Sequence, residues 1–140
     1  MGTLKCVCVA REKDKPPVNI HQGTVGVLGL SGDIHYGTKH QISILPYERV
    51  KQYYSEKGED VRYGSFGENL VVEGIDWTKA KVGDCYCCDD VILRITQLGL
   101  PSDIPEETAS AQYPEMTKYY VFCKVVYEGI LTEEEPFFEY

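Results

Sequence analysis

Apolar and polar residues alternate in several stretches of the chain, in the two-residue repeat that is typical of β-strands. The alternating stretches are residues 4–11, 85–88 and 116–128, and residues 42–45, 71–77 and 91–97 also predict strands. One segment differs: in residues 46–57, Val50, Tyr53 and Tyr54 recur at helical spacing, and Gly58 stands where helices commonly end. The pattern therefore predicts a mainly β fold, a β-barrel or mixed β-rich domain, with one or two short helices.

Charged and proline-rich segments separate these elements. Residues 12–17 predict an exposed loop, and residues 98–114 predict a long irregular loop of the kind that often carries a site. Asp89 and Asp90 predict the turn of a hairpin between two of the strands, and residues 132–140 predict a frayed end. With 140 residues and no internal repeat or linker, we expect one domain, residues 1–140.

The charge of the chain bears on its partners. A net charge of −8 without a basic stripe argues against nucleic acid. The chain also has no apolar run of the length that crosses a bilayer and no basic and apolar leader, so we expect a soluble cytoplasmic protein without a membrane partner. Phosphate-binding, serine-hydrolase and zinc-protease motifs are absent from the sequence, which disfavours the common nucleotide and hydrolase functions.

Six cysteines in such a protein are expected to be reduced thiols. Two pairs, Cys6 with Cys8 and Cys85 with Cys87, fall in regular strands, where alternate side chains are about 6.6 Å apart. Sulfurs that share one zinc ion must lie within about 4 Å of each other. We therefore interpret these pairs as small buried side chains, without a zinc site or a disulfide within a pair.

Two polar loops hold the candidate site residues. The first carries Asp33, His35, His40 and Gln41, and the second, residues 64–70, carries Phe66, Glu68 and Asn69 between and after two glycines. Glycines allow a close approach of the backbone to a ligand, and the carboxylate and carboxamide offer polar contacts. In the alternative interpretation, Phe66 fills the core while Glu68 and Asn69 cap a turn. The spacing of the histidines matches no common metal site, so no metal ligand is predicted.

Taken in chain order, these pieces resemble the MOSC domain family, named for the C-terminal domain of molybdenum cofactor sulfurases. The matching residues are Gly-Asp-Ile-His-Tyr-Gly at 32–37, His-Gln-Ile-Ser-Ile-Leu at 40–45, Gly-Ser-Phe-Gly-Glu-Asn-Leu at 64–70, Val-Gly-Asp at 82–84 and Ile-Thr-Gln at 95–97. The third piece is the most specific, and the resemblance spans roughly residues 11–126. It implies a β-rich barrel whose loops line a pocket.

The resemblance also implies a function. Proteins of this family handle the molybdenum cofactor (molybdopterin), a pterin with a phosphate and a metal held by a dithiolene, so we expect binding of this cofactor in its maturation, sulfuration or delivery. The expected cofactor-binding residues are Asp33, His35, His40, Gln41, Phe66, Glu68 and Asn69. Lys39, His40, Arg62 and Lys118 are the basic groups that we expect nearest to a phosphate. Expected partners are a sulfur donor or a molybdoenzyme. Larger members carry an aminotransferase-like half that this chain lacks, so no pyridoxal phosphate is expected.

One position departs from the family pattern. The cysteine that family members carry shortly after the Thr-Gln strand corresponds to Ser102 here. A serine hydroxyl cannot carry sulfur as a persulfide and is a poor ligand for a soft metal. Cys123 is the nearest substitute, with an inward core cysteine as the other interpretation. Two alternatives therefore stay open: a sulfur-transfer enzyme that uses another cysteine, and a non-catalytic module that binds proteins through residues 98–114 and the acidic, aromatic tail.

Overall fold

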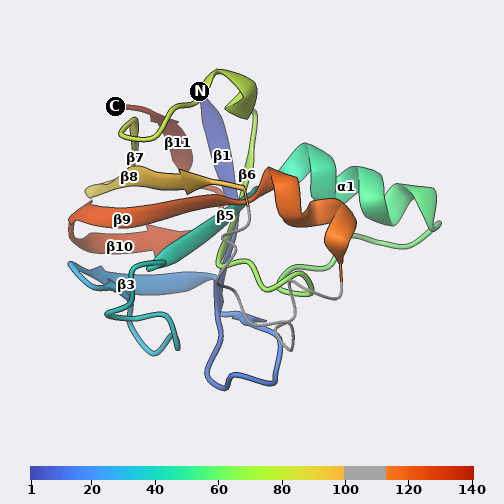
Figure 1. Cartoon of the computed structure of the whole chain (residues 1–140), viewed down its shortest axis with the longest axis horizontal. Coiled ribbons are helices and arrows are strands. Elements are labelled where there is room, and N and C mark those ends of the chain that lie inside the picture. Colours follow the sequence, from blue (N-terminus) through green and yellow to red (C-terminus); the bar gives the residue numbers. More distant parts are fainter. Residues whose placement is uncertain (100–112) are drawn as a thin grey trace.

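Seven strands close into a barrel in the computed structural model, which describes residues 1–99 and 113–140 (Figure 1). Around the barrel the order is β11, β7, β8, β9, β5, β6 and β1, and β1 pairs again with β11. The strands are β1 (Gly2–Val9), β5 (Ile42–Pro46), β6 (Leu70–Glu73), β7 (Cys85–Cys88), β8 (Val91–Leu98), β9 (Val121–Tyr127) and β11 (Pro136–Glu139). The prediction of a mainly β barrel is confirmed.

Smaller elements attach to this barrel. A second sheet has the order β10 (Gly129–Thr132), β3 (Gln22–Gly26) and β4 (Gly29–Leu30). The short strand β2 (Val18–Asn19) pairs with the end of β1. Two 3-10 helices are η1 (Trp77–Lys79) and η3 (Pro114–Tyr119). The helix η3 lies beside the α-helix, outside the barrel (Figure 1).

The pairing of β5 with β6 is the one parallel pairing among the described strands. The chain leaves β5, forms the helix α1 (Tyr47–Glu56), and returns to start β6 beside the start of β5. In this register Ile44 faces Leu70, so Ser43 and Asn69, each one residue earlier, are neighbours. A parallel crossover therefore brings two distant polar residues to the same end of the barrel.

The helix agrees with the sequence pattern. Val50 and Tyr54 are its buried residues, and Gly58 follows the C-cap residue Lys57 with φ of +67°, a conformation that costs glycine little. The β7–β8 hairpin also forms as predicted, with Cys88 opposite Val91 across the Asp89–Asp90 turn. Within the described ranges, no helix is both long enough and apolar enough to cross a membrane.

Apolar side chains gather in two clusters, one on each face of the barrel wall. The interior cluster includes Leu70 and Val72, whereas Val71 between them belongs to an outer cluster with Val50 and Phe66. Successive side chains of a strand point to opposite faces, so β6 contributes to both clusters. The outer cluster packs α1 and the 64–70 turn against the barrel.

Residues 132–140 do not fray, which corrects the prediction for the tail. Strand β11 pairs with β1 on one side and β7 on the other, and Phe137 is fully buried. The predicted strand 116–128 is also shorter than expected, because its first residues form η3 and the strand begins at Val121. Both differences arise from long-range packing that an alternating pattern cannot show.

The expected separation within the first cysteine pair is wrong. The Sγ atoms of Cys6 and Cys8 lie 3.6 Å apart, because strand geometry fixes the backbone spacing and leaves the thiols free to lean together. A register shift between Leu4 and Cys6 makes this part of β1 irregular. Both cysteines are fully buried in the outer cluster, and burial raises the pKa of Cys6. The structure records them as free thiols, and the described residues contain no group of three potential metal ligands.

Candidate functional site

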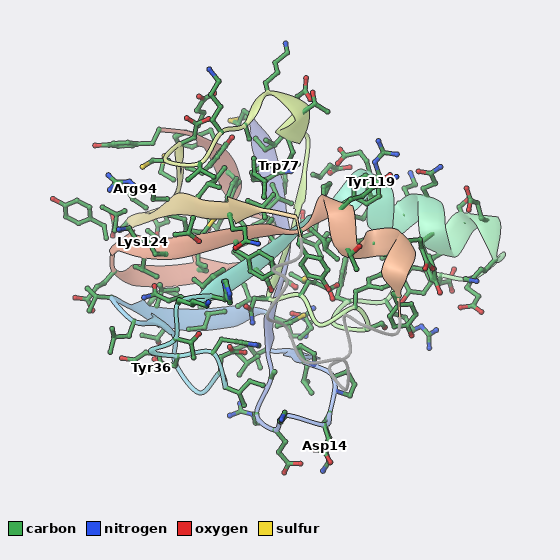
Figure 2. The ribbon with its side chains drawn as sticks, viewed as in Figure 1. Asp14, Tyr36, Trp77, Arg94, Tyr119 and Lys124 are labelled. Carbon is green, nitrogen blue, oxygen red and sulfur yellow. The ribbon has the colours of Figure 1, made fainter. Side chains whose placement is uncertain are left out.

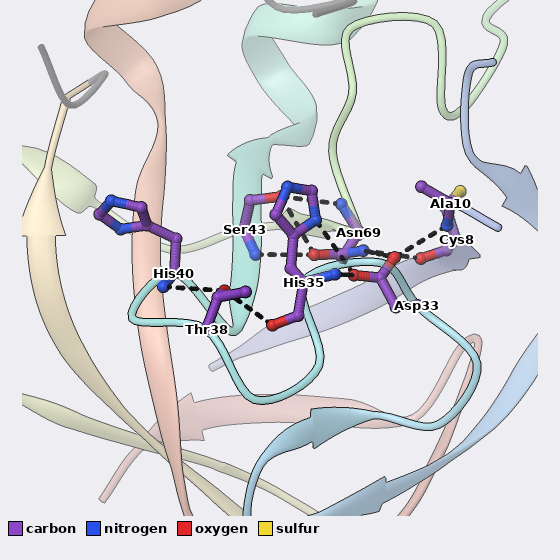
Figure 3. Close-up of polar contacts among 8 residues, drawn as sticks. All are labelled: Cys8, Ala10, Asp33, His35, Thr38, His40, Ser43 and Asn69. Carbon is purple, nitrogen blue, oxygen red and sulfur yellow. Dashed lines mark hydrogen bonds and ion pairs between the residues drawn. The ribbon is translucent and has the colours of Figure 1, made fainter. Parts of the chain in front are cut away.

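A buried polar network joins the two loops that the sequence singled out (Figure 3). The side-chain amide of Asn69 donates from Nδ2 to Oδ1 of Asp33 at 3.0 Å. Asp33 belongs to the loop of residues 31–41, and Asn69 ends the turn of residues 64–70, at the start of β6. The two loops therefore meet at one end of the barrel, although 36 positions separate Asp33 from Asn69.

Asn69 uses every polar atom of its side chain in contacts with Ser43, Cys8 and Asp33. Its Oδ1 accepts from the backbone N–H of Ser43 at 3.0 Å and from the Ser43 hydroxyl at 3.2 Å. Its Nδ2 donates to the carbonyl of Cys8 at 3.0 Å as well as to Asp33. Asn69 is 1% exposed. With both lone pairs and both N–H groups engaged, Asn69 joins β5, β1 and the Asp33 loop. Its side chain has no donor or acceptor left for a ligand.

Asp33 is the second anchor of the network, with a fully buried carboxylate. Besides Asn69, its Oδ1 accepts from the backbone N–H of Ala10 at 2.8 Å, and its Oδ2 accepts from the backbone N–H of His35 at 2.9 Å. Burial alone would raise the pKa of Asp33, but the hydrogen bonds from His35 and Ala10 outweigh it and the pKa is lowered. The carboxylate therefore stays ionised inside the protein.

His35 connects the buried carboxylate of Asp33 to the protein surface. Its Nδ1 lies 3.1 Å from Oδ2 of Asp33, and its side chain is 42% exposed. Because the carboxylate can only accept, Nδ1 carries the proton, and in the neutral ring Nε2 is left as an acceptor. An imidazole oriented by a carboxylate in this way is suited to bind a ligand or to exchange a proton with it.

His40 lies farther along the same loop and is tied to His35 through Thr38. The Thr38 hydroxyl donates to the carbonyl of His35 at 2.7 Å and accepts from the backbone N–H of His40 at 3.3 Å. The His40 ring packs against Phe122, with 5.2 Å between ring centroids. Figure 3 shows His40 on one side of His35 and the Asp33–Asn69 contact on the other. The loop thus holds both imidazoles at one end of the barrel.

Gln41 fixes the end of this loop to the barrel. Its Oε1 accepts from the backbone N–H of Val125 in β9 at 3.0 Å, and its side chain is half-buried. This contact occupies one lone pair of the amide oxygen. The structure therefore gives Gln41 a positioning contact.

Phe66 and Glu68 make structural contacts. Phe66 is fully buried in the outer cluster, with its ring centroid 4.8 Å from that of Tyr113. Glu68 is also fully buried and accepts from the backbone N–H groups of Gly64 at 3.0 Å and Phe66 at 3.1 Å. Burial raises the pKa of Glu68 to about 7 against the lowering effect of these bonds. These are the contacts of a core plug and a turn cap, which was the alternative interpretation of the sequence.

Gly64 explains why this turn needs its first glycine. Its φ is +94°, and a Cβ added there would lie 2.2 Å from the carbonyl oxygen of Pro17. A side chain at this position would force two segments of backbone apart. The glycine therefore serves the packing of the turn against the 12–17 loop region.

The sulfur-carrying position is not placed by these contacts. Ser102 lies outside the described residues. Cys123 is fully buried in the interior cluster of the barrel, and burial raises its pKa far above the ordinary thiol range. A thiol in this environment remains protonated and has no exposed surface, so it is a poor nucleophile.

Arg11 is a site residue that the sequence analysis missed. A Cβ on Gly32 would lie 3.3 Å from one guanidinium nitrogen of Arg11, so this exposed cation stands over the start of the Asp33 loop. Two of the basic residues expected near a phosphate are used elsewhere. Arg62 pairs with Glu59 at 3.2 Å, and Lys118 lies over the ring of Tyr119. The sequence signal for Arg11 was only its place directly after the first strand.

Comparisons with known proteins agree with this architecture. The MOSC domain family matches residues 31–134, a range that holds all seven expected cofactor-binding residues. No curated protein matches the chain.

Solved structures share the fold at low sequence identity. The YuaD protein from Bacillus subtilis superposes with a TM-score of 0.77 at 18% identity, covering 98% of this chain and 94% of its own. YiiM from Geobacillus stearothermophilus has a TM-score of 0.72 at 20% identity, covering 100% of this chain and 75% of its own. YiiM from Escherichia coli has a TM-score of 0.66 at 17% identity, covering 99% of this chain and 69% of its own.

Proposed function

The chain belongs to the MOSC domain family, which is associated with molybdenum cofactor binding, and on this premise we propose that it binds that cofactor at the end of the barrel around His35. The proposed role is in maturation or sulfuration of the cofactor, or in its delivery to a molybdoenzyme. The proposed location is the cytoplasm. One observation carries the proposal. The Asn69–Asp33 hydrogen bond joins the two loops most characteristic of the family, and Oδ2 of the same Asp33 orients the exposed His35.

The residues at this end of the barrel suit the organic part of the cofactor. A pterin presents N–H groups and acceptor nitrogens along its edge, and its phosphate carries negative charge. The imidazoles of His35 and His40 match the pterin edge, and the Arg11 guanidinium offers a forked set of donors for the phosphate. A local cation matters here because the chain as a whole carries a net charge of −8.

The seven expected residues divide into two groups under this proposal. His35 and His40 contact the cofactor. The other five hold the loops in place for that contact: Asp33, Gln41, Phe66, Glu68 and Asn69. This division follows from hydrogen bonding, because the carboxylates and the Asn69 amide are already satisfied by protein donors and acceptors.

The metal end of the cofactor finds less support among the described residues. A soft metal centre prefers thiolate ligands, and Cys6, Cys8 and Cys123 are fully buried. Ser102, at the position of the family cysteine, offers a hydroxyl. The protein therefore holds the cofactor by its pterin and phosphate in this proposal, and a separate donor supplies any sulfur.

Purification from cells that make the molybdenum cofactor tests this proposal. We expect bound pterin, detected by the fluorescence of its oxidised form, and molybdenum by elemental analysis. Titration with metal-free molybdopterin should give saturable binding as well, because the contacts are to the organic part. His35→Ala should weaken binding about tenfold, the effect of losing roughly one strong polar contact.

His21→Ala is the matched control. His21 is exposed and pairs with Glu133 at 2.8 Å between β3 and the turn after β10, so its loss should leave cofactor affinity unchanged. If neither the complete cofactor nor metal-free molybdopterin binds the folded protein, the proposal fails. Equal weakening by His21→Ala and His35→Ala would show that the site lies elsewhere.

A further inference from the structure

A groove separate from the His35 site opens between the start of α1, the segment around η1, and η3. Its volume is about 580 Å³, within the range of small-molecule sites. In Figure 2, Trp77 and Tyr119 lie near one another at this groove, whereas Tyr36, in the loop that carries His35, lies on the opposite side of the view. None of the seven expected cofactor-binding residues lines it.

One wall of the groove is flat and firmly held. Trp77 lines it, and its indole packs against Tyr86, with 4.9 Å between ring centroids, and against Phe137 at 6.3 Å. Ile75 and Leu98 add apolar surface beside the indole. A rigid aromatic wall with aliphatic neighbours is suited to a flat apolar body.

The facing wall brings two cations to one ring. The guanidinium carbon of Arg49, from α1, lies 4.6 Å from the ring centroid of Tyr119, and the ammonium nitrogen of Lys118, from η3, lies 5.2 Å from it. No carboxylate in residues 1–99 or 113–140 forms an ion pair with either cation. Two like charges at one ring repel each other unless an anion joins them.

The acidic residues of the groove are already engaged. Glu48 accepts from the backbone N–H of Gly74 at 2.9 Å through Oε2. Asp76 accepts from the backbone N–H of Thr78 at 3.1 Å and from its hydroxyl, which lowers the pKa of Asp76. Both carboxylates are therefore directed at the backbone of the η1 segment. Arg49 and Lys118 have no such carboxylate partner in the described ranges, and Arg49 donates from Nη1 to Oε1 of Gln52 at 3.3 Å.

We propose that this groove is a second binding site, for a small organic anion with a flat apolar body. The body lies against Trp77, and the anionic group meets Arg49 and Lys118 beside Tyr119. Carboxylate, sulfonate and phosphate groups share the required chemistry. This site is independent of the proposed cofactor site, so each can fail without the other.

The test uses the only tryptophan of the chain as the reporter, because Trp77 forms the wall of the groove. The probes are 8-anilinonaphthalene-1-sulfonate and its neutral analogue N-phenyl-1-naphthylamine, which has the same rings without the sulfonate. We expect the sulfonate to change Trp77 fluorescence saturably and to bind about tenfold more tightly than the neutral probe. A phosphate and a carboxylate of naphthalene, titrated in the same way, identify the preferred anionic group.

Variants assign the contact. Arg49→Gln and Lys118→Gln should each weaken sulfonate binding three- to tenfold and leave binding of the neutral probe unchanged. Lys124→Gln, an exposed lysine of β9 far from the groove in Figure 2, and His35→Ala should change neither affinity. The proposal is overturned if Trp77 fluorescence does not saturate, if both probes bind equally, or if the Lys124 variant weakens binding as much as the groove variants.

Discussion

Asp33 and Glu68 are two fully buried carboxylates in adjoining loops, and their pKa values move in opposite directions. The pKa of Asp33 is lowered, and the pKa of Glu68 is raised to about 7. Burial raises both, so the donors around each carboxylate make the difference. Asp33 accepts from two side chains and two backbone N–H groups, one of the side chains being the ionisable His35. Glu68 accepts from the backbone of its own turn.

This difference distinguishes Asp33, whose carboxylate contacts a solvent-exposed side chain, from Glu68, whose carboxyl group accepts hydrogen bonds from buried backbone. The ionised Asp33 connects three segments and orients an imidazole that reaches solvent. Glu68 accepts from the backbone N–H groups of Gly64 and Phe66 within its own turn, and neither of these hydrogen-bond partners is an exposed side chain. Equal burial therefore does not imply an equal role. The four predictions below test this contrast.

Asp33→Asn should cause the largest loss of stability. The carboxamide keeps one acceptor oxygen, so its NH₂ group must face either the donors of Ala10 and Asn69 or those of His35. We expect the free energy of unfolding to fall by about 3 to 5 kcal/mol, as when one partner of a buried charged network is removed. Urea denaturation at pH 7 measures it.

Asp14→Asn is the control for this change, because Asp14 lies in the exposed 12–17 loop. Its effect should stay within about 0.5 kcal/mol. Equal stability of the Asp33 and Asp14 variants would show that the network does not hold the two loops together.

Glu68→Gln should remove a pH dependence that the wild-type protein shows. An acid whose pKa is higher folded than unfolded binds its proton more tightly in the folded state, so stability falls as pH rises between the two values. For Glu68 these are 4.5 and about 7. The wild type should therefore lose about 3 kcal/mol over this interval through Glu68, at about 1.4 kcal/mol for each pKa unit.

Urea denaturation at pH 4.5 and pH 7.5 measures the slope. Glu59→Gln, at an exposed residue that pairs with Arg62, should retain the wild-type slope. Parallel curves for wild type and Glu68→Gln would show that folding leaves the pKa of Glu68 near its ordinary value of 4.5, and the contrast with Asp33 would be lost.

The strands of the barrel and its helix could be predicted because the pattern that indicates each of them lies within its own residues. Alternation in residues 91–97 and helical spacing of Val50 and Tyr54 are set by burial on one face of each element. The tail escaped prediction because its strand forms by pairing with distant strands, β7 and β1, the latter more than 130 positions away. Nothing within residues 132–140 indicates which partner strands are available.

The sequence selected the residues of the candidate site but did not indicate where their side chains point. The resemblance selected Asp33, His35 and Asn69, which do meet at one end of the barrel. In a turn there is no strand or helix repeat to tell which side chain points inward, so only the structure decides between the two interpretations of Phe66 and Glu68. Arg11 was missed because its nearness to Gly32 depends on how β1 and the loop pack.

Ser43→Ala should lower the free energy of unfolding less than Asp33→Asn does, by weakening the contacts that hold Asn69. The Ser43 hydroxyl donates to Oδ1 of Asn69 and accepts from the Asn69 backbone N–H at 3.1 Å. Both groups of Asn69 keep another bond, to the backbone N–H and carbonyl of Ser43, so neither is left unsatisfied. We expect a loss of about 1 kcal/mol by thermal or urea denaturation. Ser55→Ala, on the exposed surface of α1, should be neutral, and a neutral Ser43→Ala would mean that the hydroxyl adds nothing to the backbone contacts.

His35→Ala should change stability least and the charge of Asp33 most. The imidazole is 42% exposed, so its contact with the Asp33 carboxylate contributes less than about 1 kcal/mol. Its removal takes one side-chain donor from Oδ2, so the pKa of Asp33 should rise. Because a lowered carboxylate pKa gives stability that is lost as pH falls through it, acid unfolding should begin at higher pH in this variant. Carbon NMR titration of the Asp33 carboxyl measures the shift, and His21→Ala should leave it unchanged. If the pKa of Asp33 stays low without His35, the hydrogen bonds from Ala10 and Asn69 are sufficient to keep the carboxylate ionised. The imidazole then makes no contribution to the charge of Asp33.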